Sequence, residues 1–186
     1  SAQGPEPANL YTDLATAYYQ RGQYETALER AEQAIAADDR SPNAHYLLGL
    51  IEQAIGRTDD AERAFARARQ LDPDNPVYLN ATAVLLCRQG QYQQAIRSFE
   101  TAAETPLYET PEVALSNAAG CALQSGDEQT AAALWRSALR KNPDYPPALL
   151  ELATMAYSQG RLQQAREYLN GYSSVGEVTP RALHLA

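Results

Sequence analysis

The sequence has two histidines and two cysteines, residue types often used in nucleophilic, acid–base and metal chemistry: His45, His184, Cys87 and Cys121. Neither histidine has a cysteine or another histidine at the spacing of a metal-binding motif. His45 falls near the start of a predicted helix, at a position that usually holds a large amphipathic side chain. We therefore expect a packed or half-exposed role for His45 rather than a catalytic one.

The two cysteines lie in predicted helices that open two successive repeats, at the twelfth and tenth repeat positions. At about 100° per residue, these positions point to nearly opposite sides of their helices. We therefore expect Cys87 and Cys121 to be poorly placed for a disulfide and to pack as small, free apolar side chains. Two cysteines form no disulfide framework, so their number leaves the cellular compartment open.

Motifs of the common enzyme classes are missing from the sequence. It has no glycine-rich phosphate loop, no serine-nucleophile motif and no cluster of metal ligands, so we expect no enzyme activity and no cofactor. The net charge of −8, with Lys141 as the only lysine, also disfavours a nucleic-acid partner. No apolar run reaches the 18 residues that a membrane span needs.

Five glycines recur at intervals of 34 or 36 residues, and each is followed five residues later by alanine. The pairs are Gly22 and Ala27, Gly56 and Ala61, Gly90 and Ala95, Gly126 and Ala131, and Gly160 and Ala165. A 34-residue period of this kind, with a bulky residue and a proline at fixed places, is typical of the tetratricopeptide repeat (TPR), a pair of antiparallel helices. The chain resembles the TPR family over almost its whole length.

This resemblance implies an all-α fold, a right-handed α-solenoid of helix-turn-helix repeats. We interpret residues 1–7 as a leader or linker and residues 8–186 as a single TPR domain. The expected repeats are 8–41, 42–75, 76–111, 112–145 and 146–179, with the start of a sixth helix pair at 180–186. Ser41, Asn75 and Thr110 precede helix-opening prolines and can cap those helices.

Two repeat positions predict how the helices pack. The eighth position is always small, which allows close crossing of paired helices; it holds Ala15, Gly49, Ala83, Ala119 and Ala153. The twenty-fourth position fills the space between helices and holds Ala31, Phe65, Phe99, Trp135 and Leu169. We therefore interpret Trp135 as a core residue.

The fifth repeat departs from the pattern. We expect Gly171 to end its second helix early, Tyr172 to replace the usual alanine, and residues 173–176 to form a loop. Thr179 and Pro180 then predict the start of a further helix. An open end of this kind predicts a missing sixth repeat or a covering interface.

A separate stripe follows the second, fifth, ninth and twelfth positions of each first helix, and none of its residues is charged. In the TPR family this stripe lines the concave, partner-binding groove. The candidate binding residues are Tyr19, Tyr46, Leu50, Val77, Asn80, Val84, Val113, Leu123, Leu150 and Tyr157. Such a stripe suits an amphipathic helix or an extended apolar segment of another protein, and it lacks the Lys and Arg with which TPR co-chaperones hold a carboxylate.

The alternative is that the chain itself covers the stripe, through residues 1–7 or through further C-terminal helices. If the stripe is open, Leu50→Arg and Val84→Arg should leave helical content and melting nearly unchanged.

The irregular connection Thr105-Pro106-Leu107-Tyr108-Glu109-Thr110-Pro111, followed by Val113 and Asn117, adds a second resemblance. A Leu-Tyr loop before an Asn-bearing helix, together with the irregular fifth repeat, is similar to the PilF/PilW family of type IV pilus biogenesis.

The PilF/PilW resemblance implies a lipoprotein at the periplasmic face of the Gram-negative outer membrane; separately, we expect the chain to be a monomer. It would act as a pilotin that brings the pilus secretin into that membrane and promotes its multimerisation. An acylated cysteine upstream of Ser1 would be its anchor, and Tyr19, Tyr46 and Tyr157 would anchor the secretin segment. Two alternatives stay open: a generic TPR scaffold of another assembly complex, and a regulatory domain of a larger enzyme.

Overall fold

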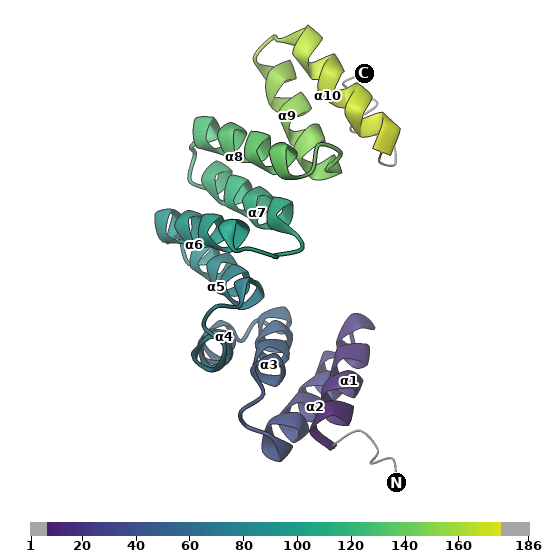
Figure 1. Ribbon diagram of the computed structural model, residues 1–186, viewed down its shortest axis with the longest axis vertical. Helices are drawn as coiled ribbons and strands as arrows, with labels where there is room; N and C mark the ends of the chain where they lie inside the picture. The colour runs from purple at the N-terminus through teal and green to yellow at the C-terminus, as the bar shows by residue number, and fades with distance from the viewer. Residues whose placement is uncertain (1–6, 176–186) are drawn as a thin grey trace. The chain divides into compact units, whose positions relative to one another are not determined.

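The computed structural model describes residues 7–175, which form ten α-helices and no strand (Figure 1). The all-α prediction is therefore confirmed. The chain divides into two compact units, unit 1 up to Leu85 and unit 2 from Leu86 onward. The boundary falls within α5, which spans Pro76–Arg88.

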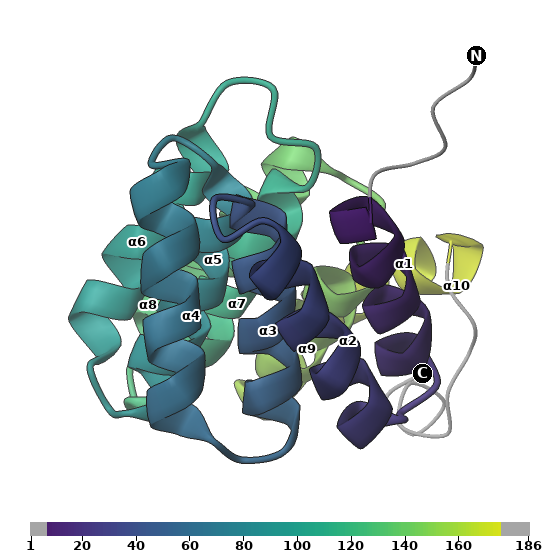
Figure 2. The same ribbon diagram turned by 90° about the horizontal axis from the view of Figure 1, so that it is seen from below.

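Unit 1 contains four complete helices, and successive helices pack as pairs. These helices are α1 (Pro7–Gln20), α2 (Tyr24–Ala37), α3 (Pro42–Ala54) and α4 (Thr58–Leu71). Helix α1 packs on α2, and α3 packs on α4, which lies beside it in Figure 2.

Unit 2 contains the end of α5 and five complete helices. These are α6 (Tyr92–Glu104), α7 (Pro111–Gln124), α8 (Glu128–Lys141), α9 (Pro146–Ser158) and α10 (Leu162–Val175). The main pairs are α7 with α8 and α9 with α10, and α6 also packs on α7.

Glycines end the first helix of each pair, as the spacing predicts. The five recurring glycines have φ values between 72° and 85°, in the left-handed region that side chains other than glycine avoid. In each case the residue after the glycine donates its N–H to the carbonyl five residues earlier, as Arg57 does to Glu52 at 2.8 Å. This bond pattern closes the helix and turns the chain into the second helix.

Two of the three predicted caps are confirmed. The Ser41 hydroxyl accepts the Ala44 N–H at 3.2 Å, and the Asn75 side chain accepts the Val77 N–H at 3.0 Å. The prediction for Thr110 is wrong, because its side chain makes no capping bond. Instead the Thr110 carbonyl accepts the Val113 N–H at 3.1 Å, so the backbone alone forms the entry to α7.

The two packing positions behave as predicted. The bulky side chains Phe65, Phe99, Trp135 and Leu169 are all buried, at 1%, 1%, 3% and 4% exposure. At the eighth position of the second repeat, a β-carbon on Gly49 would overlap the buried ring of Phe65. Glycine at position 49 is therefore required by the packing of α3 against α4.

The prediction that Gly171 ends the last helix is wrong, since α10 continues through it to Val175. A β-carbon at Gly171 would lie 3.3 Å from Leu149, so this glycine allows α10 to approach α9 closely. Tyr172 is buried beside it and takes the place of the expected alanine. Glycine thus serves close packing here and does not end the helix. The helix predicted at Thr179 and Pro180 lies outside the described residues.

Candidate protein-binding surfaces

In unit 1, the candidate binding residues of α1 and α3 are partly buried, because they pack against the core. Tyr19 packs on the cluster formed by α1, α2 and α3, and its ring centroid lies 5.7 Å from that of Tyr24. Tyr46 and Leu50 pack on a second cluster that includes Phe65 and Leu85. These three side chains are only partly available to a partner.

The other predicted residues of unit 1 lie on α5. Val77 is exposed at 37%, whereas Asn80 and Val84 are half-buried. Val77 is therefore the most accessible of the three.

In unit 2 the stripe has two well-exposed apolar side chains, Leu123 at 40% and Tyr157 at 48%. Val113 is half-buried, and Leu150 packs beside Leu149 and Tyr172. Of the three tyrosines considered as anchors, Tyr157 alone is exposed. Leu123 and Tyr157 are thus the strongest candidates for contact with another protein.

The stripe is interrupted at Cys87, which forms a disulfide with Cys121. The Cα atoms of the two residues are 5.8 Å apart, and both side chains are buried. The prediction of two unpaired cysteines is therefore wrong. First helices of successive repeats meet through opposite sides, so the offset of about 200° between the two positions turns the cysteines toward each other.

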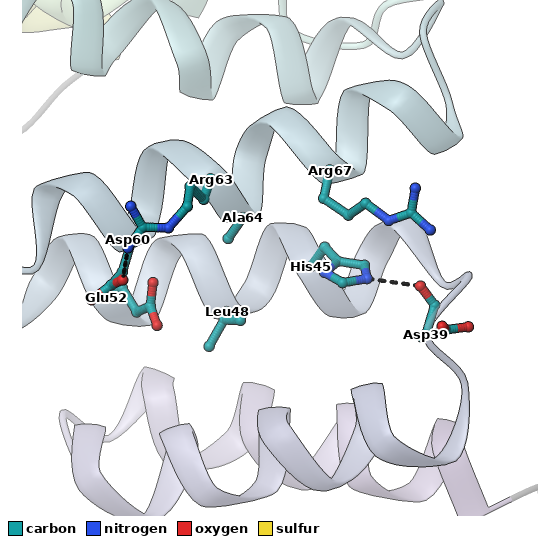
Figure 3. A pocket seen from close by; sticks show the side chains of 8 residues that line it. All are labelled: Asp39, His45, Leu48, Glu52, Asp60, Arg63, Ala64 and Arg67. Atoms are coloured by element: carbon teal, nitrogen blue, oxygen red, sulfur yellow. Dashed lines mark hydrogen bonds and ion pairs between the residues drawn. The ribbon is translucent and has the colours of Figure 1, made fainter.

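Unit 1 also contains a hollow of about 390 Å³, shown in Figure 3, that the repeat pattern does not predict. Its lining comes from Asp39 in the α2–α3 connection and from one side of α3 and α4. The lining residues are Asp39, His45, Leu48, Glu52, Asp60, Arg63, Ala64 and Arg67. His45 Nε2 bonds to the Asp39 carbonyl at 2.8 Å, and Arg63 pairs with Asp60. The prediction of a packed or half-exposed histidine is confirmed at His45.

Glu52 is the unusual residue of this hollow, because the residue is only 8% exposed and its Oε2 has no hydrogen-bond partner. Burial raises the pKa of Glu52, and the nearby negative charge of Asp60 raises it further. Arg57 acts in the opposite direction on this pKa. Burial and Asp60 both disfavour the charged form of this carboxyl group.

Reasoning from repeat positions in the sequence missed two features, the disulfide and the buried carboxyl group of Glu52. For the disulfide, the available signal was the separation of 34 residues between the cysteines, which equals the repeat period. For Glu52, the signal was an acidic residue at a position that faces the neighbouring helix.

Among the described residues, no group of three or more His, Cys, Asp and Glu side chains could hold a metal ion. Within residues 7–175, no helix has the length and apolar character of a membrane span.

Residues 12–76 and 80–134 match one sequence model of the tetratricopeptide repeat, and residues 122–185 match another. The chain belongs to the tetratricopeptide repeat family. Proteins of this family are generally interaction modules that bind other proteins through stacked helix pairs. The paired helices and the left-handed glycines therefore form the repeat that the 34-residue period predicts.

Among TPR proteins, the chain is similar to a type IV pilus assembly protein, PilF of Pseudomonas aeruginosa. The two are 27% identical over 180 residues, which is 97% of this chain and 71% of PilF. The solved structure of P. aeruginosa PilF superposes with a TM-score of 0.86, covering 97% of this chain and 81% of that structure.

A second solved structure is that of PilW, a widely conserved type IV pilus biogenesis factor. It is 28% identical to this chain with a TM-score of 0.82, and the match covers 98% of this chain and 84% of PilW. The resemblance to the PilF/PilW proteins is therefore confirmed both in sequence and in fold.

Proposed function

We propose that this TPR chain acts in type IV pilus biogenesis as a pilotin, a binding protein that promotes outer-membrane localisation and multimerisation of the secretin. The observation that carries the proposal is the similarity to PilF, which extends over 97% of the chain with a TM-score of 0.86. A match to the repeat alone would support any TPR scaffold. A match of this length to pilus proteins favours a role in pilus assembly.

The role we propose is binding without catalysis. In unit 2, Leu123 and Tyr157 offer apolar area to a segment of the secretin, and in unit 1 Val77 does so. Burying a large apolar side chain contributes about 1.5–3 kcal/mol, so a few such contacts supply useful affinity. The stripe carries no charge, so the secretin segment that binds should also be apolar.

The disulfide supports a location outside the cytoplasm. Disulfides form and persist in oxidising compartments such as the bacterial periplasm, and they are rare in the cytosol. The buried bond between Cys87 and Cys121 is therefore consistent with a lipoprotein on the periplasmic face of the outer membrane. In this proposal an acylated cysteine upstream of the TPR repeats provides the anchor.

The mechanism follows from these parts. A lipid anchor holds the protein at the outer membrane, and the stripe covers an apolar segment of a secretin subunit that would otherwise aggregate. The subunit is then retained at the membrane where it multimerises.

Deletion of the gene in the native host tests the proposal. We expect loss of the heat- and detergent-resistant secretin multimers, with subunits left in the inner membrane and no surface pili. Normal multimers and normal twitching in the deletion strain would contradict the pilotin function.

Complementation then tests the surface. Leu123→Arg and Tyr157→Arg change exposed side chains, so we expect folded protein that fails to restore multimers. They are sharper than changes at Leu50, which packs on a buried cluster. Arg136→Glu on the exposed face of α8 is the control and should restore multimers.

A further inference from the structure

The connection between α6 and α7 presents an apolar side chain at its tip. The Leu107 side chain is 99% exposed, and the next most exposed large apolar side chain of the described residues, Leu162, is at 57%. The connection is visible as the irregular segment that links α6 to α7 in Figure 1. An apolar side chain so fully exposed has almost no contact with its own fold, so the fold does not explain it.

The backbone at Leu107 is also unfavourable for leucine. Tyr108 donates its N–H to the Thr105 carbonyl at 3.2 Å, which closes a four-residue turn with Pro106 and Leu107 in the middle. Leu107 has φ of 64°, the left-handed conformation that a type II turn requires at its third residue. Glycine or asparagine normally occupies this place, because leucine there is strained.

The turn is held firmly at its base. Thr105 donates its N–H to the Ala102 carbonyl, and its hydroxyl bonds to the Thr101 carbonyl at 3.0 Å. Tyr108 is half-buried, so the chain returns to the surface of unit 2 directly after Leu107. The turn therefore holds Leu107 in a defined, exposed position. The backbone strain at this leucine has no explanation in the packing of the fold itself.

Charge around the turn indicates what kind of surface it meets. The sequence has no Lys or Arg between Arg97 and Arg136, and Glu104 and Glu109 on either side of the turn are exposed. The exposed acidic pair that flanks the leucine in sequence disfavours contact with nucleic acid and with anionic lipid headgroups. It complements a protein surface whose apolar pocket has Lys or Arg at its rim.

We propose that Leu107 is a docking residue, which inserts into an apolar, basic-rimmed pocket of the partner protein. This inference rests on the proposed function, in which that partner is the secretin. It adds a contact outside the stripe, formed by the α6–α7 connection. The strained turn pre-positions the leucine, so less ordering is needed when the complex forms.

The test measures binding of the full chain to the detergent-solubilised secretin of the same organism by biolayer interferometry. Leu107→Asn removes the apolar side chain, and asparagine tolerates the left-handed conformation. Affinity should fall roughly 10- to 100-fold, while the melting temperature stays the same or rises. Leu162→Asn, at the next most exposed leucine of the described residues, is the matched control and should bind like the wild type.

Charge reversal tests the basic rim. Glu109→Lys should weaken binding at low salt, and the difference should shrink at high salt because ions screen exposed charges. Tighter binding by Glu109→Lys would overturn the proposed charge of the pocket.

The outcomes separate the two proposals. Three results would overturn the docking role and leave the pilotin function standing. Leu107→Asn could bind with wild-type affinity, Leu162→Asn could lose as much affinity as Leu107→Asn, or Leu107→Asn could lower the melting temperature. If the wild-type chain fails to bind the secretin and deletion leaves multimers intact, the proposed function fails and the docking role fails with it.

Discussion

The two units of this TPR chain hold successive helices together by different means. In unit 1 the Tyr46 ring lies 5.9 Å from Phe65 and 5.2 Å from Tyr78, measured between ring centroids, so aromatic packing joins α3, α4 and α5. In unit 2 the disulfide between Cys87 and Cys121 joins the last turn of α5 to α7. Ring packing stabilises the folded state, whereas a disulfide acts mainly by restricting the unfolded chain. The repeat pattern thus determines the helix pairs, and residues outside the pattern determine how neighbouring pairs are fastened.

Removal of the disulfide should have the largest effect on stability. The bond closes a segment with a sequence separation of 34, so we expect Cys87→Ala/Cys121→Ala to lose about 2–4 kcal/mol of unfolding free energy. The measurement is urea unfolding followed by the fluorescence of Trp135, the single tryptophan, which lies in unit 2.

Reductant provides the control for this variant. It should lower the unfolding midpoint of the wild type toward that of the double variant and leave the variant unchanged. Two free thiols in wild-type protein that is unfolded without reductant would show that the bond is absent.

The next largest effect concerns close packing, and two helical glycines form a matched pair. Gly49→Ala in unit 1 places a β-carbon against the buried Phe65 ring, and overpacking of this kind costs about 1–3 kcal/mol. Gly120→Ala in unit 2 meets no atom within 4 Å and should gain about 0.5–1 kcal/mol from its helix propensity. Thermal unfolding of both variants checks the pair, and a gain at Gly49→Ala would refute the packing described for α3 and α4.

Helix caps give a smaller difference between the units. Ser41→Ala removes a side-chain cap of α3 and should cost about 1 kcal/mol. Thr110→Ala at the start of α7 removes no capping bond and should change stability little. Chemical unfolding of the two variants tests the contrast, and equal losses would mean that the cap assignment is incorrect.

The smallest predicted effect is the pH dependence due to Glu52 in unit 1. Its pKa is raised by burial and then by Asp60, so the folded protein binds this proton more tightly than the unfolded chain does. The stability that the folded protein gains from this tighter proton binding is fully present below the ordinary pKa of glutamate. It is lost as the pH rises through the raised pKa of Glu52 in the folded state. Glu52→Gln stays neutral and should therefore become more stable relative to the wild type from acidic to neutral pH.

Melting temperatures measured across that pH range test the prediction for Glu52. The exposed residue Glu29 supplies the control variant Glu29→Gln, whose difference from the wild type should show no such rise. A constant difference between Glu52→Gln and the wild type at every pH would contradict the shift.

The sequence was sufficient for the helix pairs because small, bulky and turn residues recur at fixed positions, as with Gly56, Ala61 and Phe65. The sequence was misleading where one residue type can serve two structural roles, as glycine does in ending a helix or in allowing close packing. Gly171 resembles a helix terminator, yet it serves a close approach to Leu149. Likewise, the angle between Cys87 and Cys121 was judged on one helix, whereas the bond depends on how two helices face each other.

The candidate binding surface was predictable only in outline. Positions within the repeat identify the stripe, but exposure depends on what neighbouring helices cover. Tyr46 and Tyr157 belong to the same stripe, yet Tyr46 packs on Phe65 while Tyr157 is 48% exposed. The display of Leu107 depends on one backbone angle, which residue type alone does not predict.

The central claim, that this TPR protein binds the pilus secretin, is tested most directly by photo-crosslinking in the native host. A benzophenone amino acid at Tyr157, on the stripe, is compared with the same group at Arg136, on the exposed face of α8. We predict a covalent adduct with the secretin from position 157 and none from position 136. Folded protein at normal abundance that gives no secretin adduct from position 157 would contradict the account.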